Sequence, residues 1–145
     1  MRAVAPQSDW DVRRFRPNLV LDDGVAPGEL TERELLGAQL RSSSGVRLRV
    51  GLPTPRCVVP TRAREELPAD PALLKAIARQ SRWDLGPFGR PACLGAYAEV
   101  AHGGHLAVGE RLTVEPGARR TPESAVAAVV ERVVAETATV EPPSG

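Results

Sequence analysis

The chain has 145 residues and a net charge of +1, because its 19 basic and 18 acidic residues nearly cancel. This balance gives no general attraction to nucleic acid or to a membrane surface, and no apolar run approaches the ~18 residues of a membrane span. Hydrophobic residues make up 42% of the chain but aromatic residues only 3%, so we expect one domain with a core of Val, Leu and Ala.

The first half of the chain predicts short β-structure joined by turns. Residues 18–22, NLVLD, are apolar and predict a short strand, and residues 28–36 indicate a helical turn. A hairpin is predicted from residues 39–41 to residues 46–50, VRLRV, where apolar residues alternate with arginines. The stretch PTPRCVVPT follows at once, so we expect Cys57 just beyond a strand.

The second half predicts one clear helix and two further strands. Asp70 and Pro71 form a helix start, N-cap and first position, before ALLKAIARQ. A loop rich in glycine and proline follows, and then strands are predicted at residues 93–100 and 106–114. The histidines of HGGH, residues 102–105, could suggest a metal, but we interpret them as an exposed connection on a Gly-Gly turn.

The C-terminal part carries a stripe of valines. Thr121-Pro122 repeats the helix-start signature, and five valines follow it at helical spacing: Val126, Val129, Val130, Val133 and Val134. Valine forms helices poorly on its own, so this helix needs tertiary contacts. It packs either onto its own domain or onto a partner chain, and the tail beyond it is expected to fray.

Cys57 is the first candidate for chemistry. A free cysteine is most often a small buried hydrophobic residue. Arg56 beside it favours the thiolate, which is the nucleophile and metal ligand, and the surrounding prolines stiffen the loop. Thiolate suits soft metals better than magnesium or calcium, and zinc would need a fuller set of ligands. With two cysteines and no export signal we expect a cytoplasmic protein with reduced thiols, while a Cys57–Cys93 disulfide stays open.

A second candidate is the basic run of Arg13, Arg14 and Arg16 before the first predicted strand. Arginine donates to phosphate through a planar fork, so three arginines in four positions can form a phosphate clamp. The same run is equally typical of a solvated basic loop. Composition alone does not decide between these readings.

Three motifs in matching order and spacing resemble the MOSC domain, the family named for the C-terminal domain of molybdenum cofactor sulfurase. They are RFRPNLVLD at residues 14–22, PTPRCVVPT at residues 53–61 and CLGAYAEV at residues 93–100. VGERLTV, residues 108–114, is similar to the family's closing strand, with Glu110 where aspartate is more common. The resemblance covers residues 11–114.

The resemblance implies an α+β, β-rich fold, namely a partial MOSC-type β-barrel with flanking helices and an added C-terminal helix. Residues 1–115 are expected to form the MOSC-like domain. Residues 116–145 are expected to form a linker, the C-terminal helix and the frayed tail.

The resemblance also implies a molybdenum cofactor of the molybdopterin type. Cys57 is then the expected catalytic residue and molybdenum ligand, or the thiol that carries sulfur. Arg16 and Asn18 are expected to bind the pterin phosphate, with Arg14 assisting. Arg56 is expected to belong to the cofactor site by supporting the thiolate electrostatically.

Two activities are implied by the resemblance. Members related to the amidoxime-reducing component remove oxygen from N-hydroxylated compounds, and sulfurase-type members transfer sulfur to the cofactor. We therefore expect a molybdenum-dependent oxidoreductase for N-hydroxylated small molecules that uses an external electron donor, or a sulfur carrier that uses a sulfur donor. The alternative is a non-catalytic, truncated remnant that acts as an interaction module through its valine stripe.

The chain departs from the family pattern at its start. Family members carry a β-rich segment before FRPN, whereas about a dozen residues precede it here. We therefore expect the C-terminal portion of the pattern, explained by a displaced start site, a separate second chain or a reduced domain. Open sheet edges invite pairing, so we expect a homodimer, a complementing chain or poor solubility.

Overall fold

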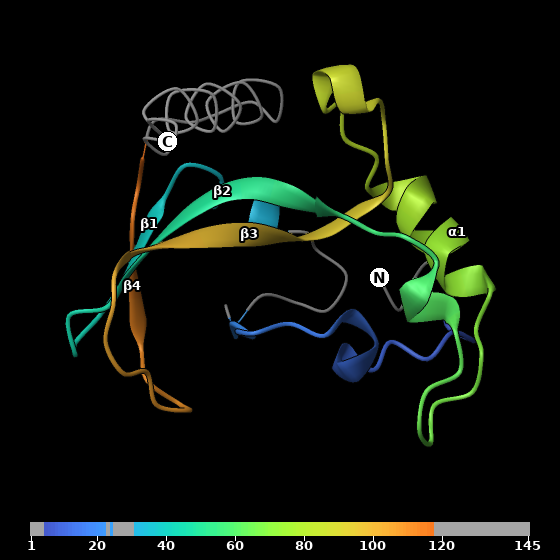
Figure 1. Ribbon diagram of the computed structural model, residues 1–145, viewed down its shortest axis with the longest axis horizontal. Helices are drawn as coiled ribbons and strands as arrows, with labels where there is room; N and C mark the ends of the chain where they lie inside the picture. The colour runs from blue at the N-terminus through green and yellow to red at the C-terminus, as the bar shows by residue number, and fades with distance from the viewer. Residues whose placement is uncertain (1–4, 23, 25–30, 118–145) are drawn as a thin grey trace, which may run out of the picture.

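The computed structural model describes residues 5–22, 24 and 31–117. At its centre lies a four-stranded sheet in the order β3-β2-β1-β4, with every neighbouring pair antiparallel (Figure 1). The strands are β1 (Gln39–Ser42), β2 (Arg47–Pro55), β3 (Cys93–His102) and β4 (Leu112–Glu115). One α-helix, α1 (Ala72–Gln80), accompanies them in this part of the chain, with the 3-10 helices η1 (Val12–Phe15), η2 (Thr31–Arg33), η3 (Val59–Thr61) and η4 (Gly86–Phe88).

The predicted hairpin is confirmed. β1 and β2 pair with Leu40 opposite Leu48, and the turn between them contains Gly45 at a φ of 94°, a conformation that glycine adopts without steric cost. β2 ends at Pro55. Cys57 therefore follows the end of a strand, as expected.

The sheet has one apolar and one charged face, because side chains alternate along each strand. Leu40 and Val50 of the apolar face are buried in a cluster with Leu36, Trp83 and Leu85. On the other face Arg41 pairs with Glu115 at 2.8 Å and Arg49 pairs with Glu99 at 3.6 Å. Arg49 is one of the two polar positions of the alternating VRLRV pattern.

The start of α1 is confirmed to within one residue, since the helix begins at Ala72 with Pro71 at its N-cap position. The Asp70 carboxylate still accepts a hydrogen bond from the Ala72 backbone N–H, at 3.1 Å. The helix buries Leu73 and Ile77 in a second cluster. Trp10 and Phe15 pack against this cluster, so α1 anchors the N-terminal segment to the rest of the domain.

The α+β class is confirmed, and in the described part of the chain the sheet expected to form a partial barrel is an open sheet and not a closed barrel. The sheet is open, with β3 and β4 at its two edges. Closing a sheet into a barrel requires the strands to tilt and their register to stagger until the two edge strands pair. In the described part of the chain β3 and β4 do not pair with each other.

Two predicted strands differ from the structure. Residues 18–22 are irregular, and Leu19, Val20 and Leu21 are exposed. Their apolar character predicts a strand only where a partner strand can take their backbone hydrogen bonds. The strand predicted at residues 106–114 is shortened to β4, because the Glu110 carboxylate accepts from Ala107 N–H, Ser43 O–H and Ser44 N–H and closes a loop instead.

The valine stripe and the predicted C-terminal helix lie outside the described residues, and the domain boundary after residue 115 stays a prediction. The helical turn predicted near residues 28–36 appears as η2, with residues 28–30 also outside the description. The helices that the structure describes are all too short or too polar to cross a membrane.

Candidate functional site

Arg56 joins the three motif segments of the sequence. Its Nη1 donates to the Phe15 carbonyl oxygen at 3.2 Å, and its Nε donates to the Leu94 carbonyl oxygen at 2.8 Å. Its guanidinium carbon lies 5.5 Å from the centre of the Phe15 ring, within the range of a cation–π contact. RFRPN, PRC and CLGAY are therefore tied together by one side chain.

The surroundings of Arg56 explain why a glycine follows Leu94. A Cβ at Gly95 would lie 3.2 Å from Arg56 Nη2, and Gly95 has a φ of +77°. Its N–H donates to Glu32 Oε1 at 3.1 Å. Burial lowers the pKa of Arg56, but arginine stays protonated in proteins.

The two cysteines have different environments. Cys57 is exposed, Cys93 is buried with an exposed fraction of 1%, and both are free thiols. The disulfide that the sequence left open is therefore absent. Burial raises the pKa of Cys93 to about 11 against the opposing charges of Arg56 and Arg33, so Cys93 is the hydrophobic core cysteine and Cys57 is the accessible thiol.

Arg16 and Asn18 are exposed on the loop that follows η1. Arg16 ends η1 in the left-handed conformation, with φ 51° and ψ 49°. Its backbone N–H donates to the Arg13 carbonyl oxygen at 3.3 Å. Neither side chain hydrogen-bonds to any residue that the structure describes, so both have donors to offer a ligand.

Arg14 differs from Arg16 because it is buried. Its Nη2 donates to Asp9 Oδ2 at 3.1 Å and to the Pro68 carbonyl oxygen at 2.9 Å. Its Nε is buried without a partner among the described residues. These contacts already engage the guanidinium inside the protein, and the predicted phosphate contact of Arg14 stays a prediction.

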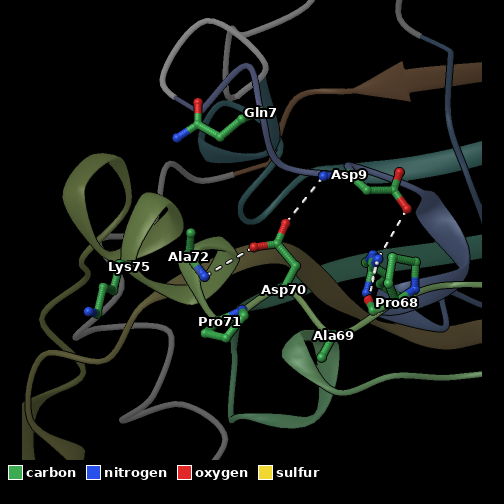
Figure 2. A pocket seen from close by; sticks show the side chains of 9 residues that line it. Gln7, Asp9, Pro68, Ala69, Asp70, Pro71, Ala72 and Lys75 are labelled. Carbon is green, nitrogen blue, oxygen red and sulfur yellow. Dashed lines mark hydrogen bonds and ion pairs between the residues drawn. The ribbon is translucent and has the colours of Figure 1, made fainter.

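A cavity of about 510 Å³ lies beside the start of α1 (Figure 2), and Cys57 is not among its lining residues. Its lining consists of the Asp9 and Asp70 region together with the first turn of α1: Gln7, Asp9, Arg14, Pro68, Ala69, Asp70, Pro71, Ala72 and Lys75. Figure 2 shows the Asp70 carboxylate between the N–H groups of Asp9 and Ala72. The Asp70 carboxylate already accepts a hydrogen bond from the backbone N–H of Ala72 at the helix start. Since the carboxylates of Asp9 and Asp70 both line the cavity, the cavity is a poor site for an anion.

The described part of the chain holds no cluster of three or more His, Cys, Asp or Glu side chains that could hold a metal ion. His102 and His105 are both exposed. His102 is the last residue of β3, and His105 lies on the connection to β4. Glu32 is a site residue that sequence reasoning missed, since nothing in the local pattern around residues 28–36 indicates its contact with Gly95.

The fold and site define an α+β domain in which an exposed thiol follows a sheet strand and an arginine ties its loop to a basic segment. The MOSC domain family model matches residues 1–113, and this chain belongs to that family. The family is associated with binding of a molybdenum cofactor. No curated protein and no solved structure matches the chain. The expectation that it represents the C-terminal portion of the family pattern stays a prediction.

The exposed groups fit the chemistry of such a cofactor. Cys57 offers a soft sulfur donor, which suits a metal of molybdenum's type better than a hard cation. Arg16 and Asn18 offer exposed guanidinium and amide donors, which suit a phosphate group. Arg56 is the neighbour of Cys57 in the sequence, and its hydrogen bond to Phe15 ties the Cys57 loop to the segment that carries Arg16 and Asn18.

Proposed function

We propose that this chain binds a molybdenum cofactor of the molybdopterin type, with Cys57 as the metal ligand and Arg16 and Asn18 as donors to the pterin phosphate. The observation that carries the proposal is the pair of hydrogen bonds from Arg56 to Phe15 and Leu94. Through them the basic loop is held to the loop that contains the exposed thiol.

In this proposal Arg56 is a positioning residue. Its side chain is occupied by two carbonyl oxygens, so its contribution is to hold the loops and not to contact the phosphate. Arg14 is likewise a positioning residue, since it fixes η1 to the backbone near Pro68 and Pro60. Arg16 and Asn18 then meet the ligand from a backbone that both arginines hold.

The first candidate reaction is the reduction of N-hydroxylated small molecules. When bound, the cofactor supplies the two-electron chemistry that releases the hydroxyl oxygen as water. The exposed position of Cys57 leaves a ligand held there accessible to small molecules from solvent. The electrons come from an external donor.

The second candidate is sulfur carriage, and the exposure of the Cys57 thiol favours it. The Cys57 thiolate would attack the outer sulfur of a donor persulfide, forming a Cys57 persulfide and releasing the donor thiolate. This step needs a donor that can reach the thiol. A non-catalytic interaction module is the remaining candidate, and it requires no chemistry at Cys57.

The proposal is tested by producing the full chain in a host that makes molybdopterin and measuring molybdenum and pterin per chain. We expect about one of each per chain, lost in Cys57→Ala and kept in Val58→Ala, which changes the exposed neighbour. Arg16→Ala should lower pterin occupancy, and Arg62→Ala, an exposed arginine of the neighbouring loop, should not. Wild-type protein without metal or pterin would overturn cofactor binding.

The two reactions are separated by two measurements on the same protein. Loaded protein is mixed with an N-hydroxylated amidine and a chemical electron donor, and the amidine product is quantified. Cofactor-free protein is treated with a low-molecular-weight persulfide, and mass spectrometry measures the gain of one sulfur atom on the Cys57 peptide. Failure of both, with the fold intact, favours the interaction module.

A further inference from the structure

A continuous row of apolar residues crosses all four strands of the sheet. Val114 of β4 is paired with Leu40 of β1, Leu40 with Leu48 of β2, and Leu48 with Val100 of β3. Directly opposed residues of antiparallel strands project from the same face. These four residues, called the apolar row below, therefore form one stripe from edge to edge.

The centre of the apolar row is covered and its ends are not. Leu40 is 3% exposed and packs in the cluster of Trp83 and Leu85, whereas Val100 is 67% exposed and Val114 is 49% exposed. A sheet face that is apolar across its full width is ordinarily covered by another layer. The part of the row at β3 and β4 thus requires an additional covering element.

The chain itself supplies a candidate for this element. It leaves β4 at Glu115, at one edge of the sheet, and residues 118–145 follow outside the described structure. The family match ends at residue 113, so this segment is additional to the matched domain. Its valine stripe has the one-sided spacing that a helix needs to pack on an apolar face.

The dimensions of the two surfaces agree. A helix carries valines 126 to 134 over about 12 Å at 1.5 Å per residue, and four strands at about 4.8 Å spacing span about 14 Å. Residues 116–125 reach about 33 Å when extended, which is more than enough to bring the stripe back over the sheet. A tethered segment has a local concentration on the order of millimolar, so it outcompetes a second copy in dilute solution.

We propose that residues 122–135 of this chain dock as a helix across the apolar row, with the valine stripe covering Val100 and Val114. The inference is independent of the proposed function, because it concerns the face of the sheet and involves neither Cys57 nor a cofactor. It assigns the C-terminal segment an intramolecular role in completing the domain.

Cysteine labelling of the full chain tests the docking. Val100→Cys or Val114→Cys is introduced together with Cys57→Ser, and the rate of maleimide labelling is measured. Adding Val130→Asp should accelerate labelling about tenfold by opening the covered face. Adding Ala128→Asp, on the opposite side of the predicted helix, should leave the rate unchanged.

Two further measurements, the labelling of Cys93 and the dependence of protection on protein concentration, make the test decisive. Buried Cys93 reports global unfolding, and if it becomes labelled in the Val130→Asp protein, the milder Val130→Ser takes its place. Equal labelling rates with and without the stripe substitution would overturn the proposal. Protection that grows with protein concentration would also overturn it, by assigning the cover to a second copy.

Discussion

The Arg56 guanidinium donates to the Phe15 carbonyl oxygen at 3.2 Å and lies 5.5 Å from the Phe15 ring centre. Phe15 of η1 thus contacts the same guanidinium twice, through its carbonyl oxygen and through its aromatic ring. Since Arg56 precedes Cys57, this contact sets where the basic loop sits relative to the thiol loop. The site depends on one side chain with two directed hydrogen bonds.

Arg56→Lys is expected to loosen this arrangement while keeping the charge. A lysine is a flexible point charge and cannot reproduce the planar, directed donors to Phe15 and Leu94. We expect the free energy of unfolding to fall by about 1–3 kcal/mol and amide hydrogen exchange to accelerate in residues 12–18. Arg62→Lys is the matched control, and equal exchange in the two variants would contradict the assignment.

Gly95→Ala is expected to displace Arg56, because the added Cβ lies 3.2 Å from Nη2. Gly109 has a similar φ of +84° but no atom within 4 Å of the added Cβ, so Gly109→Ala measures the backbone cost alone, about 1 kcal/mol. Urea denaturation should show a larger loss for Gly95→Ala than for Gly109→Ala. Equal losses would show that the Arg56 contact tolerates the methyl group.

Arg14→Met and Arg13→Met are expected to behave differently although the two residues are neighbours. Arg14 is buried and donates to Asp9 and Pro68, so its replacement should lower the free energy of unfolding by about 2 kcal/mol. Arg13 is exposed and pairs with Asp11 at 2.7 Å. Its replacement should lower the unfolding free energy less than the replacement of Arg14 does, because solvent screens an exposed ion pair.

Arg13→Met should instead be visible at Asp11. Hydrogen bonds from the Arg13 side chain and backbone hold the pKa of Asp11 at about 2, below its ordinary 3.8. Without the guanidinium we expect this pKa to rise toward the ordinary value, measured by NMR titration of the Asp11 side chain. An unchanged pKa would mean that the backbone N–H alone accounts for the shift.

The raised pKa of the buried Cys93 thiol leads us to expect a loss of stability at alkaline pH. Burial raises its pKa from 9.0 to about 11, so between these values the folded chain keeps a proton that the unfolded chain has lost. The stabilisation is complete below pH 9.0 and disappears as the pH rises to about 11, with a size on the order of 2 kcal/mol. Denaturation across this range should show the fall in Cys57→Ala but not in Cys93→Ala.

The elements that the sequence predicts correctly have local signals. The alternation of VRLRV identifies β2, and Asp70 with Pro71 identifies the start of α1, since capping and alternation act over a few residues. The position of Cys57 after a strand follows from the same reasoning. The local pattern of residues 18–22 is just as apolar, but no strand of the described part pairs with it.

The contacts that assemble the site have no local signal. Arg56 was expected to act on the thiolate, and nothing in its neighbours indicates hydrogen bonds to residues 41 and 38 positions away. Glu32 reaches Gly95 across 63 positions, and the burial of Arg14 depends on the backbone near Pro68. Such contacts follow from the whole fold, which short periodicities do not encode.

These long separations also order the events of folding. Leu40 and Leu48 pair across a short turn, so the β1–β2 hairpin can form from nearby residues soon after it is synthesised. The Arg56 hydrogen bonds need η1 and β3 at once. We therefore expect the Cys57 loop to reach its final position only after β3 has joined the sheet, so the proposed cofactor would find its complete site only from that step on.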